Sequence, residues 1–571
     1  MSKGHNNYSA FRHWTCLAVI MASLVLLTGK AVQLQWEQGE FLKRQGLART
    51  VRTVVVKPNR GRILDRNGEI LAVSTPVDSI TADPRVLCAN EAVWQPLVDA
   101  LEIEMDVITM LCKRAADQEF AYLKRHIPPI DAKAVLDLEF PGVHQLREYR
   151  RYYPLGPIAA HVVGMTDIDD YGLEGLERQF EAVLGGEEGL NRIVRDRKGR
   201  VVERVQRIKP VRHGSDIDTS IDARIQYATR RALAKSLSEF KAAGASAIVM
   251  DAHTGEVLAM VNLPDFNPNR RTHENTSAYR NRAVTDLLEP GSTIKPFTVA
   301  MALSSGEFSP DTVIDTSPGT YRIGRNTIHD VHDYGPLTVS RVIIKSSNIG
   351  AAKIAMALPP IRLYEMFHDV GFGSTTGIEL PGERIGTLVK RKKWRPIEHA
   401  TLSYGYGMAA TPIQIAQAYA VLANGGRMVP VTIRKRNHPV DGERILSTTV
   451  ARTIVDMLEG VVTRDGTARR AKVYNYRVAG KTGTSHKLVG GQYAEDRYVS
   501  SFAGMAPASN PRFVMVVVVD DPRSDRYYGG YVAAPVFAEV MAEVLRLYNI
   551  APDDVSLEQV GVDAKRRGAG A

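Results

Sequence analysis

At positions 289–297 the chain reads Glu289-Pro290-Gly291-Ser292-Thr293-Ile294-Lys295-Pro296-Phe297. Pro290 and Gly291 interrupt the structure that precedes this stretch. Pro296 is tolerated only in a first helical turn, so a helix is predicted to begin at about Ser292. Because residues three positions apart share a helix face, the hydroxyl of Ser292 and the amine of Lys295 are predicted to lie within hydrogen-bond reach.

A serine and a lysine at this spacing can form a nucleophile with its base. A serine is a weak nucleophile until a base removes its proton, and a lysine is a base only while it is neutral. Lowering a lysine pKa from about 10.4 to near 7 needs burial and nearby positive charge worth roughly 4 kcal/mol. The pair Ser292 and Lys295 therefore predicts a second cation close by. The same spacing at Ser238 and Lys241 lies in a charged amphipathic segment, and we interpret it as a solvated helix face.

Length and composition indicate a globular protein of two or three domains. The chain has 571 residues, of which 44% are hydrophobic and 24% charged, and its formal net charge is +10. Basic residues are scattered, with no long Lys/Arg run interleaved with aromatics, so the pattern argues against nucleic-acid binding and fits an anionic surface or polymer. No cluster of Cys and His has metal-ligand spacing, and neither a metal nor another cofactor is expected.

One apolar stretch, Trp14 to Gly29, lies near the amino terminus. Basic residues and no acid precede it, and Lys30 can snorkel so that the stretch reaches membrane-spanning length. A cleaved signal peptide is the alternative, but no small-x-small cleavage site is evident after the stretch. We interpret it as an uncleaved signal anchor, with the amino terminus in the cytoplasm and the remainder of the chain outside.

The region after the anchor predicts a non-catalytic α+β pedestal. Asn67-Gly68 between two apolar strands is a strong hairpin signal, and no nucleophile-plus-base pattern occurs from 40 to 210. Gly214-Ser215-Asp216 is typical of a boundary. Cys88 and Cys112 could pair, but the sequence does not establish whether they do. The predicted order is a cytoplasmic N-terminus 1–13, a transmembrane anchor 14–34, the pedestal 35–213, a second domain 214–550 and a flexible basic tail 551–571.

The second domain is predicted to contain one antiparallel sheet. Two strands at 246–251 and 256–261 precede the Ser292 helix, and a further helix is predicted over 339–358. The chain ends in three strands and a helix, at 477–484, 498–505, 513–519 and 535–548. The predicted fold class is therefore α+β, an antiparallel five-stranded sheet between helical layers, preceded by an α+β pedestal domain and a single N-terminal transmembrane helix.

Three short motifs occur in order along the second domain. They are Ser292-x-x-Lys295, Ser346-Ser347-Asn348 and Lys481-Thr482-Gly483-Thr484. Together they match the signature of penicillin-binding proteins and class A β-lactamases, which act through an active serine. Each motif is common by chance, but all three in this order, with the last on a predicted strand, are not.

Further stretches resemble the division-specific class B penicillin-binding proteins, the FtsI family, over nearly the whole chain. They are Arg60-Gly61-x-Ile63-x-Asp65-Arg66, Arg280-Asn281-Arg282, Glu289-Pro290-Gly291-Ser292, Lys345-Ser346-Ser347-Asn348, Tyr404-Gly405-Tyr406-Gly407, Ala503-Gly504-Met505-Ala506-Pro507, Tyr527-Tyr528-Gly529-Gly530 and Ala534-Pro535-Val536-Phe537. The resemblance implies a peptidoglycan DD-transpeptidase of the bacterial inner membrane, with its catalytic domain in the periplasm. It would cross-link stem peptides of the septal wall during cell division and be a target of β-lactams. The resemblance also implies an FtsW-type membrane glycosyltransferase and other divisome proteins as partners.

The resemblance assigns roles to the catalytic residues. Ser292 would attack the carbonyl between two D-alanines of a stem peptide, and neutral Lys295 would accept its proton. Ser346 would relay a proton to the leaving amine, and Asn348 would bond the substrate amide or orient Lys295. Lys481 would be the second cation, with a charge that suits the terminal carboxylate of the substrate.

The substrate-binding residues implied by the resemblance lie on the last motif. The hydroxyls of Thr482 and Thr484 would bind the terminal carboxylate, and Gly483 would provide backbone clearance. The backbone N–H groups of Ser292 and Thr484 would form the oxyanion hole, in which each donor is worth about 3 to 4 kcal/mol. We expect Ser347 to be a packing or capping residue.

Other functions share these motifs. A serine β-lactamase would be about half as long and without an anchor, and a DD-carboxypeptidase uses water in place of the attacking amine. A bifunctional wall synthase would need a glycosyltransferase domain for which the interval after the anchor has no room. The elongation-specific class B transpeptidase is the nearest alternative, and a catalytically idle divisome scaffold or penicillin sensor is another. Retention of the five residues Ser292, Lys295, Ser346, Asn348 and Lys481 argues against an idle scaffold.

Overall fold

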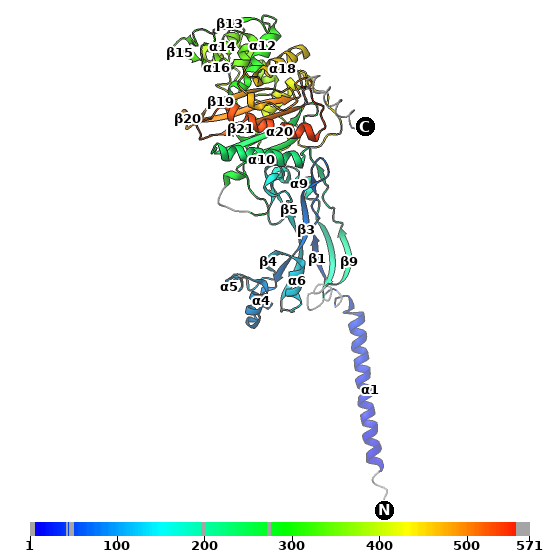
Figure 1. Cartoon of the computed structure of the whole chain (residues 1–571). Coiled ribbons are helices and arrows are strands. Elements are labelled where there is room, and N and C mark those ends of the chain that lie inside the picture. Colours follow the sequence, from blue (N-terminus) through cyan, green and yellow to red (C-terminus); the bar gives the residue numbers. More distant parts are fainter. Residues whose placement is uncertain (1–5, 42–43, 45–50, 196–200, 271–275, 555–571) are drawn as a thin grey trace, which may run out of the picture. The chain divides into compact units, whose positions relative to one another are not determined.

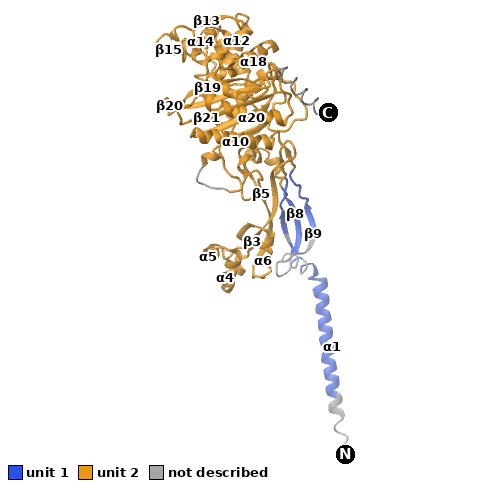
Figure 2. Ribbon diagram, viewed as in Figure 1, with its two compact units in different colours: residues 1–59, 186–214 blue, residues 60–185, 215–571 orange. Residues whose placement is uncertain are grey.

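The computed structural model describes residues 6–41, 44, 51–195, 201–270 and 276–554. It divides into two compact units, residues 1–59 with 186–214 and residues 60–185 with 215–571 (Figure 2). Residues 1–5 of the predicted cytoplasmic segment and residues 555–571 of the predicted basic tail lie outside the described residues.

The first unit contains a long apolar helix and a three-stranded sheet. Helix α1 spans Asn6–Trp36, and its portion Phe11–Trp36 is exposed and is long and apolar enough to cross a membrane. The predicted anchor, residues 14–34, falls inside this helix, which fits a single-pass membrane anchor. The sheet is antiparallel, with the order β1-β8-β9, and its strands are β1 Val51–Val56, β8 Gly189–Arg195 and β9 Val201–Lys209.

The second unit begins with a five-stranded sheet built on β3, Ile70–Ala82. Its order is β10-β2-β3-β4, and β5 also pairs with β3. The predicted Asn67-Gly68 turn joins β2 to β3. The carboxylate of Asp65 stabilises this turn by accepting hydrogen bonds from the N–H groups of Asn67 (2.7 Å) and Glu69 (2.8 Å). The remaining strands are β2 Ile63–Leu64, β4 Ala121–Ile127, β5 Val143–Tyr152 and β10 Ile217–Asp218.

A helical lobe with its own hydrophobic core follows β3. Leu87, Leu97 and Ile108 are fully buried in this core, which is separate from the main one. Its helices are α3 Pro84–Leu87, η1 Glu91–Val93, α4 Trp94–Leu101 and α5 Met105–Ala115, and α6 Pro129–Leu136 packs against them after β4.

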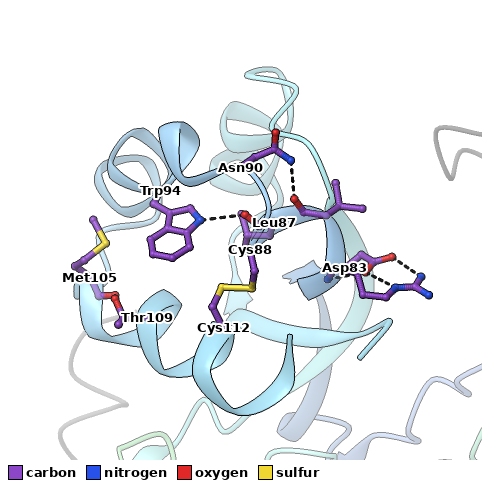
Figure 3. Close-up of a disulfide and its surroundings, with 10 residues drawn as sticks. Asp83, Leu87, Cys88, Asn90, Trp94, Met105, Thr109 and Cys112 are labelled. Carbon is purple, nitrogen blue, oxygen red and sulfur yellow. Dashed lines mark hydrogen bonds and ion pairs between the residues drawn. A yellow bond between two sulfur atoms is a disulfide. The ribbon is translucent and has the colours of Figure 1, made fainter. Parts of the chain in front are cut away.

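A disulfide between Cys88 and Cys112 joins the end of α3 to α5 inside this lobe (Figure 3). The sequence left this pairing open, and the structure forms it. The indole N–H of Trp94 donates to the carbonyl of Leu87 beside it, at 3.0 Å. The two cysteines are 24 residues apart, and closing a loop of that length disfavours the unfolded chain by about 3 kcal/mol.

The large sheet of the second unit has the order β12-β11-β21-β20-β19 and is antiparallel at every pair, which confirms the predicted five-stranded sheet. Helices α10 (Ala223–Glu239) and α20 (Ala534–Leu547) pack on one face (Figure 1), and α17 (Pro412–Ala423) and α18 (Thr448–Val462) pack on the other. Because both faces are covered, the central strand β21 is almost continuously apolar and buried. Strand β19 lies at one edge. The strands are β11 Gly244–Asp251, β12 Val257–Leu263, β19 Ala479–Val489, β20 Gln492–Ala506 and β21 Phe513–Asp520.

The helices and minor strands of the second unit surround these sheets. The helices are η2 Gly156–Ile158, α7 Ala160–Val163, α8 Gly175–Gln179, α9 Glu181–Leu184, α10 Ala223–Glu239, η3 Thr276–Tyr279, α11 Arg282–Thr285, η4 Gly291–Ile294, α12 Lys295–Ser305, α13 Val339–Lys345, α14 Asn348–Met356, α15 Pro360–Asp369, α16 Pro396–Leu402, α17 Pro412–Ala423, α18 Thr448–Val462, η5 Arg469–Ala471, α19 Gly529–Val532 and α20 Ala534–Leu547. The minor strands are β6 Met165–Thr166, β7 Gly172–Glu174, β13 Val313–Asp315, β14 Thr320–Ile323, β15 Asn326–His329, β16 Pro336–Thr338, β17 Arg427–Met428 and β18 Glu443–Arg444.

Candidate active site

The nucleophile segment forms a tight 3-10 turn that leads into α12. The helix predicted to begin at about Ser292 begins one residue earlier, at Gly291, and becomes an α-helix only at Lys295. Pro296 has no N–H to donate to the carbonyl of Ser292, and the N–H of Lys295 bonds that carbonyl instead. The turn holds Gly291 at a φ of 53°, packed directly against the backbone of Gly405.

The side chain of Lys295 is fully buried beneath this turn. Its Nζ donates hydrogen bonds to the carbonyl of Ser346 (2.5 Å), to Oδ1 of Asn348 (2.7 Å) and to the hydroxyl of Ser346 (3.3 Å). Among the residues that the structure describes, the hydroxyl of Ser292 makes no hydrogen bond, so the predicted direct bond to Lys295 is not formed. Such bonds are often long in a free enzyme and shorten only with substrate.

A break between two helices carries Ser346 and Asn348. The single helix predicted over 339–358 is divided into α13 and α14, because Ser346 adopts a left-handed conformation with a φ of 61°. Ser347 is the N-cap of α14, and its hydroxyl accepts a hydrogen bond from the N–H of Gly350 at 2.8 Å. This capping role is the one expected for Ser347.

Lys481 reaches the same point from β19. Its side chain is fully buried, and its Nζ donates to the hydroxyl of Ser346 (2.8 Å) and to the carbonyl of Thr482 (3.2 Å). The Ser346 hydroxyl therefore lies between two lysines, since Lys295 Nζ is 3.3 Å away on its other side. Lys481 is thus close enough to be the second cation that the sequence argument required.

Burial lowers the pKa of both lysines. It lowers the pKa of Lys295 to about 7, while the carboxylate of Asp330 acts in the opposite direction and raises it. Burial, reinforced by the charge of Lys295, holds the pKa of Lys481 well below its ordinary range. The sequence predicts that a nearby cation contributes to the lowered pKa of Lys295, but burial alone lowers it here. A neutral amine near pH 7 is what a general base for serine requires.

Asp330 supports the Ser346 turn, although no sequence motif pointed to it. Its Oδ1 accepts hydrogen bonds from the N–H groups of Asn348 (2.5 Å) and Ile349 (3.1 Å) at the start of α14. Its Oδ2 accepts from the hydroxyl of Ser347. A carboxylate is favoured at a helix N-terminus, and here it fixes the turn against which Lys295 is bonded.

The threonines of the third motif are held by neighbouring loops. Thr482 Oγ1 lies 2.8 Å from Thr467 Oγ1, where either hydroxyl can donate. Thr484 Oγ1 accepts a hydrogen bond from the N–H of Gly529 at 3.1 Å. Both side chains are therefore oriented on β19 before any ligand arrives.

The nucleophile turn packs directly on β19. A Cβ at Gly483 would overlap Ser501 Oγ and lie 2.9 Å from Thr293 Cγ2, so no side chain fits there. A Cβ at Gly291 would lie 4.0 Å from the carbonyl oxygen of Thr484. The backbone segments that carry Ser292 and Thr484 are thus neighbours, as a shared oxyanion hole requires.

Glu289 joins three segments around the nucleophile and was not singled out from the sequence as a site residue. Its carboxylate accepts hydrogen bonds from the N–H of Gly407 (3.0 Å) and, on both oxygens, from the hydroxyl of Tyr493 (3.0 Å each). Its carbonyl accepts from Ser485 Oγ at 3.2 Å. Burial raises the pKa of this carboxyl. Glu289 thereby ties the turn at Gly407 and the β19–β20 hairpin to the segment that leads into Ser292.

Family models match both folded parts of the chain. Residues 245–542 match the model described as the penicillin binding protein transpeptidase domain, and residues 55–219 match the penicillin-binding protein dimerisation domain. The first model includes all three motifs and the β19 edge. The second covers the sheet built on β3 and the disulfide-bonded lobe.

Relatives and solved structures agree with these models. The peptidoglycan D,D-transpeptidase FtsI of Escherichia coli K12 is 39% identical over 555 residues, which cover 96% of this chain and 94% of that protein. The probable peptidoglycan D,D-transpeptidase PbpC of Pseudomonas aeruginosa is 37% identical over 568 residues and all of both chains. The apo transpeptidase domain of Burkholderia pseudomallei penicillin-binding protein 3 is 43% identical, with a TM-score of 0.55 over 59% of this chain and 97% of that one. Penicillin-binding protein 3 of Mycobacterium tuberculosis, complexed with aztreonam, is 30% identical, with a TM-score of 0.69 over 88% of this chain and 99% of that one.

Proposed function

We propose a serine acyl-transfer reaction for this chain on the premise that it belongs to the FtsI-type family of penicillin-binding peptidoglycan D,D-transpeptidases. The substrate is a peptidoglycan stem peptide that ends in D-Ala-D-Ala. The observation that carries the proposal is the convergence of two buried lysines, Lys295 and Lys481, on the hydroxyl of Ser346 beside the Ser292 turn.

Acylation starts at Ser292. Its Oγ attacks the carbonyl between the two D-alanines, and its proton passes to neutral Lys295. The C–N bond then breaks, the leaving D-alanine amine takes up a proton delivered through the Ser346 hydroxyl, and an ester remains on Ser292. An amine of a neighbouring stem attacks this ester and gives up a proton by the same route. The cross-link is formed, and the Ser292 hydroxyl is restored.

Binding groups on β19 hold the reacting end. Lys481, Thr482 and Thr484 bind the terminal carboxylate, and Asn348 orients Lys295 through its 2.7 Å hydrogen bond. An arriving carboxylate favours the charged form of Lys481, so this lysine becomes a cation as substrate binds. The N–H groups of Ser292 and Thr484 stabilise the oxyanion, each by about 3 to 4 kcal/mol.

A β-lactam tests the proposal because it acylates the same serine. The full chain in detergent is incubated with benzylpenicillin and weighed by intact-mass spectrometry. We expect one adduct of penicillin mass that lasts minutes to hours, and none in Ser292→Ala. Ser238→Ala, which alters the second Ser-x-x-Lys of the chain, is the matched control and keeps the adduct. Unmodified protein with hydrolysed drug would identify a β-lactamase instead, and unmodified protein with intact drug would overturn the reaction.

We also propose a cellular setting, which the anchor helix and the family support. Residues 1–13 are cytoplasmic, 14–34 span the inner membrane, and the pedestal 35–213 and transpeptidase domain 214–550 lie in the periplasm. The Cys88–Cys112 disulfide supports this orientation, since disulfides persist in oxidising compartments. The reaction cross-links septal wall, and the glycan strands come from an FtsW-type membrane glycosyltransferase among other divisome proteins. The FtsI names of relatives support the septal role.

A further inference from the structure

A buried tyrosine that belongs to none of the three motifs bonds the backbone beside the nucleophile. The hydroxyl of Tyr419 donates a hydrogen bond to the carbonyl of Thr293, the residue after Ser292, at 2.7 Å. Tyr419 lies on α17, 126 residues further along the chain, and its side chain is fully buried. This bond therefore joins the turn that carries Ser292 to a helix that is distant in the sequence.

Other hydrogen bonds of this turn are local or longer. The carbonyl of Pro290 accepts from the hydroxyl of Thr293 at 2.7 Å and from the N–H of Thr293 at 3.3 Å. Bonds between residues so close in the chain move with the turn and do not fix its place in the protein. The N–H of Gly291 reaches a distant segment, the carbonyl of Gly405, at 3.3 Å. The 2.7 Å bond from Tyr419 is thus a shorter link between the turn and its surroundings.

The side chain of Tyr419 is itself held firmly in place. Its ring packs edge-on against the ring of Phe297, with centroids 5.7 Å apart, and Phe297 packs in the same way against Phe372 at 6.0 Å. Helix α17 packs against β11, β20 and β21 of the large sheet, whose edge strand β19 carries Lys481. Burial raises the pKa of Tyr419 well above its ordinary value, so its hydroxyl keeps its proton and remains a donor.

The position of the turn matters because Ser292 has no side-chain hydrogen bond to hold it. Lys295 is bonded to Asn348 on α14, and Thr484 lies on β19. In the part of the chain that the structure describes, the hydroxyl of Ser292 makes no hydrogen bond, so the backbone of its turn sets where it points. A misplacement of about 1 Å between reacting groups can lower a rate about a hundredfold.

We propose that Tyr419 is a positioning residue for the nucleophile, whose hydroxyl fixes the backbone of the Ser292 turn and so aligns Ser292 for attack. This inference rests on the proposed function, because it concerns the acylation step. Tyr419 is buried beneath the turn and does not contact substrate. It should therefore affect the rate at which a bound ligand acylates Ser292, and not the binding of that ligand.

The variant Tyr419→Phe tests this role, because it removes one oxygen atom and keeps the buried ring. Benzylpenicillin is added to the full chain in detergent at rising concentrations, and the acylated fraction is followed by intact-mass spectrometry. The concentration dependence gives the dissociation constant of the non-covalent complex and the acylation rate constant at saturation. We expect the rate constant to fall about tenfold and the dissociation constant to change less than about twofold. The final acylated fraction reports how much of the variant is folded.

The pH profile separates positioning from an effect on the base. Because Tyr419→Phe leaves Lys295 buried, the rate constant should fall by the same factor at every pH, and the midpoint of the profile should stay in place. Tyr153→Phe is the matched control. Tyr153 is also buried, and its hydroxyl accepts a hydrogen bond from the N–H of Thr166 at 3.0 Å in the pedestal. This variant loses a comparable bond far along the chain from the nucleophile and should keep the acylation rate constant of the unaltered protein.

Each outcome bears on one proposal. If benzylpenicillin labels Ser292 but Tyr419→Phe acylates as fast as the unaltered protein, or changes only the dissociation constant, the positioning role is wrong and the proposed function stands. The role is also wrong if the midpoint of the pH profile moves, or if Tyr153→Phe slows acylation equally. If benzylpenicillin does not label Ser292 in the unaltered protein, the failure lies in the proposed function.

Discussion

The pH dependence of acylation is a direct test of Lys295 as the base. Burial lowers the pKa of Lys295 to about 7, so its neutral fraction is roughly one tenth at pH 6, one half at pH 7 and nine tenths at pH 8. Since only the neutral amine accepts a proton, the rate constant for acylation of Ser292 by benzylpenicillin should rise about tenfold from pH 6 to pH 8. Above pH 8 it should level off. A lysine with the ordinary pKa of about 10.4 would be neutral in only about one molecule in 2,500 at pH 7.

The variant Asp330→Asn tests the sign of the electrostatic contribution that this carboxylate makes to the pKa of Lys295. The carboxylate of Asp330 favours charged Lys295 and so raises its pKa. Removing that charge should move the midpoint of the pH profile to lower pH. The acylation rate at pH 6, divided by the rate at pH 8, should therefore increase. Asp333→Asn alters an exposed carboxylate three residues away and should leave the midpoint in place.

At each pH from 5.5 to 9.5, the acylation reactions of these variants are quenched with acid at successive times. The acylated fraction is then measured by intact-mass spectrometry. The midpoint belongs to the coupled pair of Lys295 and Lys481, because both contact Ser346. A rate that climbs about tenfold per pH unit as far as pH 9 would refute a lowered pKa. A midpoint that stays fixed or rises in Asp330→Asn would refute the electrostatic role of that carboxylate.

Two further predictions concern stability and packing. Replacing Cys88 and Cys112 by serine should lower the free energy of unfolding of the helical lobe by about 3 kcal/mol. Hydrogen exchange of the amides within the lobe measures this loss, and labelling of Ser292 by penicillin should persist. Unchanged protection of these amides would contradict the prediction. A Cβ in Gly405→Ala would overlap the backbone of Gly291, so penicillin acylation should fall about a hundredfold. Gly306→Ala, also at positive φ but in open space, is its control, and equal rates in the two variants would exclude this packing effect.

The sequence predicted the fold well where the signal is local and periodic. Strands β11 and β12 are short, mainly apolar runs joined by a glycine turn, and the Asn67-Gly68 turn joins two apolar strands. Strand β21 is a short apolar run long enough only for a strand. The three motifs could be found for the same reason, since each is a contiguous set of residues whose chemistry is evident from their types.

What the sequence could not predict depends on distances between segments. Asp330 lies outside every motif, and only the folded chain brings it to the start of α14. The pairing of Cys88 with Cys112 likewise needs the lobe to bring the two thiols together. The left-handed Ser346 interrupts what reads as one helix, because the hydrophobic period continues through the break. No local propensity reports any of these three features.

The active lysines explain why such supporting residues matter. A pKa of about 7 for Lys295 in place of 10.5 means that the fold disfavours its charged form by about 5 kcal/mol. That is comparable with the whole stability of many domains, about 5 to 15 kcal/mol. A fold can sustain such a penalty only if Lys295 has no alternative position in water. Asp330 and Glu289 fix the segments that keep it from water, so substitutions there should alter the pH profile of acylation before they alter the amount of folded protein.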